Sequence, residues 1–240
     1  MIDMHLNPFC SYSCFGDQLD TIHAGKMMSM SNNNESIRFI HTSNAKHKIK
    51  FPLFNVLSKL LNLNCTLVEH CYEIKEHYSS SNFKCDYMTQ EHKELILRND
   101  FYQLPVETYD SFEPYLPEPY VTSQFITRNI HSYIKPEYIK AIKEHYISQG
   151  YELVGVGADA NIADLQGTTN NIKHIAKVMS NAAFHIGRDS GMMHLAKLCI
   201  PVENIHVYVP NKFPNCTRQV QEMGYKGAKI ASDGVLIDVS

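Results

Sequence analysis

The chain has 240 residues, of which 22 are Lys or Arg and 25 are Asp or Glu, so its formal net charge is −3. This balance excludes a strongly basic nucleic-acid coat, although a local basic patch stays open. Hydrophobic residues make up 44% of the chain, which suffices for a buried core, and the length allows one large domain or two small ones.

Several classes of protein lose support because their sequence patterns are missing. The seven cysteines form no Cys-x-x-Cys pair, which argues against a structural zinc site and favours reduced thiols in a cytoplasmic protein. No apolar run approaches the ~18 residues of a membrane span, and we expect no signal peptide. The zincin, α/β-hydrolase, P-loop and Asp-x-Asp patterns are all absent.

The first half of the chain predicts an α/β arrangement. Ser36 to His41 is expected to form a strand, Phe51 to Leu63 an amphipathic helix, and Cys65 to Glu69 a second strand. The polar segment from Ser29 to Ser36 is expected to form a loop.

A proline-rich segment separates the two halves. Four of the ten prolines fall between Pro105 and Pro119, and such a stretch continues neither a helix nor a central strand. We therefore predict a linker here and two domains, residues 1–118 and 119–240.

The second half alternates short apolar runs with segments of helical spacing. The expected strands and helices are a strand and loop over 121–128, a helix from Pro136 to Gly150, a strand over 151–157, a helix capped by Asn170, a strand over 183–187, a helix over 190–198 and a strand over 204–209. This alternation is typical of βαβ units around a parallel sheet, as in a Rossmann-like domain.

The most informative segment joins the strand ending at Gly187 to the helix that begins at Ser190 or Gly191. In open parallel sheets, ligands bind beyond the carboxyl ends of the strands. A helix N-terminus there offers backbone N–H groups and the positive end of the helix dipole, which suit a diphosphate. His194 lies one turn into the helix and could reach the same ligand, whereas the negatively charged Asp189 suits a helix cap or a sugar hydroxyl.

The wider pattern resembles the ADP-heptose:lipopolysaccharide heptosyltransferase type of glycosyltransferase. That family carries Gly-x-Asp-Ser/Thr-Gly-x-x-His-Leu-Ala, and every fixed position is present from Gly187 to Ala196. The stretch Leu165 to Thr169 is similar to the family's segment before this motif. The resemblance covers about residues 120–210 and implies an α/β, GT-B-like fold, with two Rossmann-like domains facing an interdomain cleft.

The resemblance also implies a set of donor-binding residues. The family often places hydroxyl and basic side chains against the donor phosphates in the loop after the first strand of its C-terminal domain, although a solvated Arg128 is an equal alternative. The donor-binding residues implied are Ser123, Arg128, Gln166, Asp189, Ser190, Gly191, Met192 and His194.

The N-terminus carries a second matching segment. Gly16-Asp17-Gln18-Leu19 is similar to the Gly-Asp-x-Leu of the family's first strand-to-helix loop, whose Asp is the proposed general base. A carboxylate suits that role because an acceptor hydroxyl is a poor nucleophile until its proton is taken. The resemblance therefore implies that Asp17 is catalytic and that Gly16 and Gln18 belong to an acceptor-side loop.

The expected function is inverting sugar transfer from a nucleoside-diphosphate sugar to a hydroxyl of a glycan or lipopolysaccharide-type acceptor. We expect no metal ion and no cofactor besides the sugar nucleotide. Two alternatives stay open. One is a compact phage-type enzyme that modifies hydroxymethylated DNA bases, and the other is a non-catalytic nucleotide-sugar-binding protein.

Overall fold

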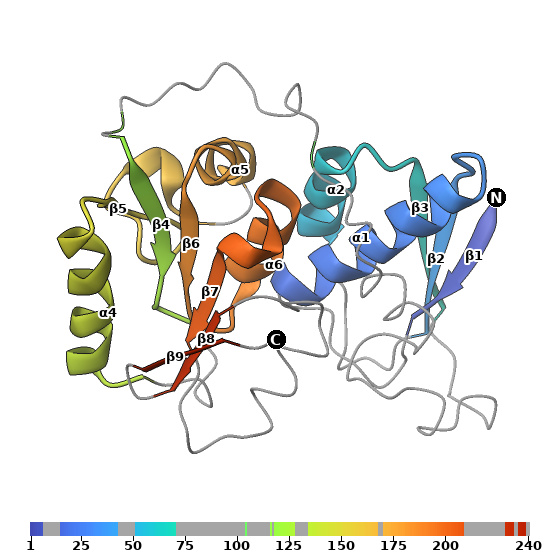
Figure 1. The fold of residues 1–240 in the computed structure, drawn as a ribbon. Helices are drawn as coiled ribbons and strands as arrows, with labels where there is room; N and C mark the ends of the chain where they lie inside the picture. Colours follow the sequence, from blue (N-terminus) through green and yellow to red (C-terminus); the bar gives the residue numbers. More distant parts are fainter. Residues whose placement is uncertain are drawn as a thin grey trace. The chain divides into compact units, whose positions relative to one another are not determined.

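The computed structural model divides the chain into two compact units, residues 1–102 and 103–240. The residues that it describes are 1–6, 15–42, 51–70, 104, 116, 118–127, 134–167, 170–208, 229–232 and 235–238. Both units are α/β with parallel strands, which confirms that part of the expected fold class (Figure 1). The domain boundary at 118/119 and the interdomain cleft stay predictions, since most of the proline-rich segment lies outside the described residues.

The first unit is a small parallel sheet with two helices. Its sheet has the order β1-β2-β3. The elements are β1 (Ile2–His5), α1 (Phe15–Ser31), β2 (Ile37–Thr42), α2 (Phe51–Leu60) and β3 (Cys65–His70). The strands and the helix expected from 36 to 69 are confirmed. The polar loop begins later than expected, because α1 continues to Ser31.

A glycine allows α1 to lie directly on the sheet. A Cβ atom at Gly25 would lie 2.4 Å from the ring of Phe39 on β2, so a larger residue would push the helix away. Phe39 in turn meets Phe54 of α2 edge to face, with ring centroids 5.2 Å apart. The aromatic pair thus fills the space between the sheet and the second helix.

The second unit is a six-stranded sheet of order β5-β4-β6-β7-β8-β9. Its elements are β4 (Tyr120–Gln124), α4 (Pro136–Ser148), β5 (Glu152–Gly155), η4 (Ala163–Leu165), α5 (Ile172–Ser180), β6 (Phe184–Gly187), α6 (Gly191–Cys199), η5 (Val202–Asn204), β7 (Ile205–Tyr208), β8 (Lys229–Ser232) and β9 (Val235–Asp238). The expected βαβ alternation is confirmed. The antiparallel edge strand β9 was not predicted from the sequence.

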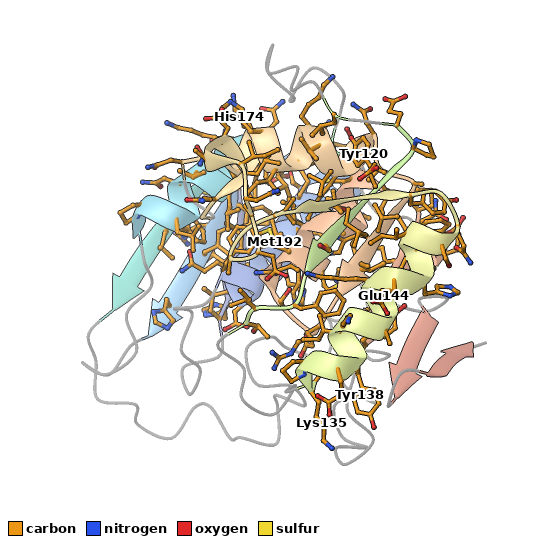
Figure 2. The ribbon with its side chains drawn as sticks, turned by 90° about the vertical axis from the view of Figure 1, so that its left-hand side faces the viewer. Tyr120, Lys135, Tyr138, Glu144, His174 and Met192 are labelled. Atoms are coloured by element: carbon orange, nitrogen blue, oxygen red, sulfur yellow. The ribbon has the colours of Figure 1, made fainter. Side chains whose placement is uncertain are left out.

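Helices cover both faces of this sheet. Val121 of β4 packs in one core cluster with Ile142 and Tyr146 of α4, and Figure 2 shows α4 in front of the sheet with Tyr138 and Glu144 along it. The neighbouring residue Tyr120 points the other way, since side chains alternate along a strand, and its hydroxyl donates to the carbonyl of Val178 on α5 at 2.8 Å.

Buried polar groups in this core pair with one another. The Tyr146 hydroxyl contacts Nδ1 of His206 and lies 3.0 Å from the hydroxyl of Tyr208. Burial raises the pKa of Tyr208 to about 12 and lowers the pKa of His185 to about 3. Nδ1 of His185 lies 3.0 Å from the hydroxyl of Thr122. His185 and Tyr208 are therefore neutral at pH 7 and belong to the core.

No helix in the described part of the chain is long and apolar enough to cross a membrane. The longest, α1, has 17 residues and carries buried polar side chains such as Gln18 and Thr21.

Candidate functional site

The candidate site lies where β4, β5 and β6 end. The chain passes from β4 through α4 to β5 on one side, and then returns through α5 to β6 on the other side of β4. The strand order therefore reverses between β4 and β6, and open α/β sheets bind ligands outside the carboxyl ends of the strands at such a point. The motif from Gly187 to Ala196, which begins at the last residue of β6, therefore lies at the position where the sequence predicted a bound ligand.

Two glycines, Gly157 in the segment after β5 and Gly187 at the end of β6, lie tightly against Gln124, the last residue of β4. A Cβ atom at Gly187 would lie 2.2 Å from the backbone oxygen of Gln124, so only glycine fits opposite it. Gly157 adopts a φ of 61°, and a Cβ there would lie 3.1 Å from Nε2 of Gln124 and 3.2 Å from Cγ of Met192. The loop at Gly157 thus lies against the side chain of Gln124, whereas Gly187 of β6 lies against its backbone.

Ser190 connects α6 to this centre. It occupies the N-cap position in an extended conformation, with φ −159° and ψ 166°, but makes no side-chain cap to its own helix. Its hydroxyl donates instead to Oε1 of Gln124 at 2.6 Å. The side chain of Ser190 therefore does not cap the first turn of α6, although its backbone carbonyl accepts the N–H of Met193 at 3.0 Å. A helix N-terminus at the end of a parallel strand suits an anion.

Gln166 joins the same neighbourhood from the segment after β5. It forms a parallel bridge with Gly157, and the backbone N–H of Gly157 donates to the carbonyl of Leu165 at 2.9 Å. The side-chain amide of Asn171 donates to the carbonyl of Gln166 at 2.9 Å. The prediction that Asn170 caps α5 was wrong, because the N-cap is Asn171 and its amide is engaged by this loop.

Met192 and His194 are buried members of the motif. Met192 is 1% exposed and touches the loop at Gly157, while His194 is 5% exposed one turn into α6. Figure 2 places Met192 in the interior of this unit. Asp189 is half-buried and directly precedes Ser190, the N-cap residue of α6, so its expected role at the helix start or on a sugar hydroxyl stays a prediction.

The two residues predicted on the β4 segment differ in outcome. Ser123 is 2% exposed, and the alternation of β4 turns it to the face of Val121, which α4 covers. Gln124, on the opposite face, makes the contact with Ser190. Arg128 lies outside the described residues. Sequence reasoning missed Gln124, although its place at the end of a buried strand was the available signal.

The N-terminal candidates lie in a helix. Because α1 begins at Phe15, residues Gly16, Asp17 and Gln18 occupy its first turn instead of the loop that the sequence suggested. Asp17 is half-buried, and its backbone carbonyl accepts a hydrogen bond from the hydroxyl of Thr21 at 2.7 Å. A carboxylate in this position is stabilised by the helix dipole.

The fold is that of glycosyltransferases of the heptosyltransferase type. The iron-containing glycosyltransferase TibC from enterotoxigenic E. coli superimposes with a TM-score of 0.54 at 13% identity, over 86% of this chain and 57% of TibC. TibC in complex with ADP-D-beta-D-heptose gives 0.52 at 13% identity, over 87% of this chain and 58% of that one.

A third solved structure extends the comparison to nearly the whole chain. A glycosyl transferase of family 9 from Veillonella parvula gives a TM-score of 0.50 at 13% identity, over 96% of this chain and 86% of the other. No family model and no curated protein matches the sequence. The chain spans less than two thirds of the length of TibC, and at these identities the likeness establishes the fold.

Proposed function

We propose that this protein is a glycosyltransferase whose second unit binds a nucleoside-diphosphate sugar. The observation that carries the proposal is the start of α6, where the hydroxyl of Ser190 bonds to Gln124 at the ends of β4 and β6 instead of capping its own helix. Both the N–H groups and the helix dipole favour a diphosphate there. The structural neighbour TibC has been solved with a ligand of this class, ADP-heptose.

The proposed reaction is an inverting transfer with Asp17 as general base. The acceptor hydroxyl attacks the anomeric carbon, its proton passes to the Asp17 carboxylate, and the bond from that carbon to the diphosphate oxygen breaks. Charge that builds on the leaving diphosphate is stabilised by the first turn of α6, with His194 and Arg128 as further donors. The reaction requires the carboxylate of Asp17 to reach an acceptor at the bound donor.

The proposed acceptor is a hydroxyl of a glycan or lipopolysaccharide-type molecule, and the proposed compartment is the cytoplasm. The seven cysteines of the sequence include no Cys-x-x-Cys pair, a pattern that favours reduced thiols in this compartment. Sugar transfer in the presence of an acceptor separates an enzyme from a non-catalytic binder. Transfer to hydroxymethylated DNA, with binding that weakens steeply as salt rises, would instead favour the DNA-modifying alternative.

Donor binding is expected to stabilise the protein against heat. A sugar nucleotide at 100 times its dissociation constant should add about 2.7 kcal/mol to the free energy of unfolding, because it binds only the folded chain. A panel of UDP-, GDP-, ADP- and CMP-sugars, measured by thermal shift, identifies the donor. Ser190→Ala should weaken the shift, whereas Ser148→Ala, which removes an exposed hydroxyl from α4, should not. A panel without any shift would contradict the proposed donor site.

We further propose that the transfer needs no divalent cation. Among the residues that the structure describes, no group of three or more His, Cys, Asp or Glu side chains is placed to hold a metal ion. Turnover measured before and after treatment with EDTA should agree within experimental error. Loss of turnover in EDTA, followed by recovery on addition of a divalent salt, would overturn this part of the proposal.

A further inference from the structure

The loop that follows β4 is held by a carboxylate from the neighbouring segment. Oδ2 of Asp159 accepts the backbone N–H of Phe125 at 2.8 Å, and Oδ1 accepts the backbone N–H of Ile126 at 2.6 Å. Each oxygen thus binds one of two consecutive peptide groups, and hydrogen bonds to a charged acceptor are stronger than neutral ones.

Arg188 holds the same loop from the other side. Its backbone N–H donates to the carbonyl of Gln124 at 3.1 Å, and its Nη1 donates to the carbonyl of Phe125 at 3.0 Å. The residue is 6% exposed, so this guanidinium is part of the interior. The peptide groups between Gln124 and Ile126 are therefore bonded by residues that follow β5 and β6.

A glycine allows the turn that carries Asp159 to fold closely onto β5. A Cβ atom at Gly155 would lie 2.2 Å from the backbone oxygen of Asp159, so the turn after β5 can fold back onto its own strand only at a glycine. The N–H of Asp159 closes this turn by donating to the carbonyl of Val156 at 3.2 Å. The sequence around Gly155 is thus built to bring Asp159 to the end of β4.

We propose that Asp159 is a positioning residue of the donor site. Its carboxylate fixes the backbone at the end of β4, and this fixed backbone places the side chain of Gln124 against the hydroxyl of Ser190. Asp159 acts through Gln124 and Ser190, with both carboxylate oxygens occupied by backbone N–H groups. We call the two hydrogen bonds from the Asp159 carboxylate to the N–H groups of Phe125 and Ile126 the clamp. The positioning role rests on the proposed function, whereas the clamp can be tested without a bound donor.

Amide hydrogen exchange in the ligand-free protein tests the clamp. Asp159→Ala should speed exchange at Phe125 and Ile126 by roughly ten- to a hundredfold, because a charge-assisted acceptor is lost, and Asp159→Asn should do so by less. Asp164→Asn removes an exposed carboxylate from the same segment and should leave both amides unchanged. Wild-type exchange at Phe125 and Ile126 in Asp159→Ala would overturn the proposal.

Donor titration tests the positioning role. Asp159→Ala should raise the KM for the sugar nucleotide about tenfold with little change in kcat, since the contact is lost in both ground and transition states. Asp159→Asn should recover part of the affinity. A KM unchanged in Asp159→Ala would overturn the positioning role. If the wild type binds no sugar nucleotide, the proposed function fails. Hydrogen exchange would still show whether the Asp159 carboxylate holds the amides of Phe125 and Ile126.

Discussion

Asp17→Asn should lower kcat about 100-fold or more and leave the dissociation constant of the donor within about twofold, because a carboxamide cannot accept the acceptor's proton. Asn has the shape of Asp, and the hydrogen bond from Thr21 goes to the backbone carbonyl of residue 17. The substitution should therefore preserve the first turn of α1. Steady-state transfer kinetics, together with a thermal-shift titration of the donor, measure the two quantities separately.

A second carboxylate of the first unit gives the matched control. Glu35 is exposed and pairs with the N-terminal amine, so Glu35→Gln removes a charge without approaching α1's first turn. Its kcat should equal that of the wild type. Near-normal turnover in Asp17→Asn would remove Asp17 from the mechanism, and loss of donor binding in that variant would assign it a structural role.

Gly187→Ala should lower the free energy of unfolding by about 3 kcal/mol and abolish donor binding, because the core cannot relax around a backbone clash at low cost. The new Cβ would lie 2.2 Å from the backbone oxygen of Gln124, between two paired strands. Any shift that relieves it also moves Gln124 away from Ser190. Urea denaturation measures the stability, and thermal shift measures the donor.

Gly150→Ala separates a clash from a general glycine effect. Gly150 has a φ of 89°, and no heavy atom lies within 4 Å of the point that a Cβ would occupy, so alanine there is strained by its backbone alone. It should cost about 1 kcal/mol and leave donor binding intact. A Gly187→Ala variant with the same urea midpoint as the wild type would contradict the close approach of β4 and β6.

Local patterns in the sequence determined most elements of both units. The apolar run before Gly187 and the helical spacing after it predict β6 and α6 within a residue or two, because burial imposes period 2 or 3.6 on any sequence. Pro136 likewise marks the start of α4. The fold class and the segment that carries the candidate site followed from such patterns and from the resemblance.

Contacts between distant residues decided the rest. Gln124 meets Ser190 across 66 positions, and Asp159 reaches Phe125 across 34. No local pattern encodes these pairs, because they depend on the strand order that places β4 between β5 and β6. The same order, with the alternation of side chains along β4, turns Ser123 into the core and Gln124 toward the motif. The sequence thus determined which segment carries the candidate site, and tertiary structure decided which side chains lie together there.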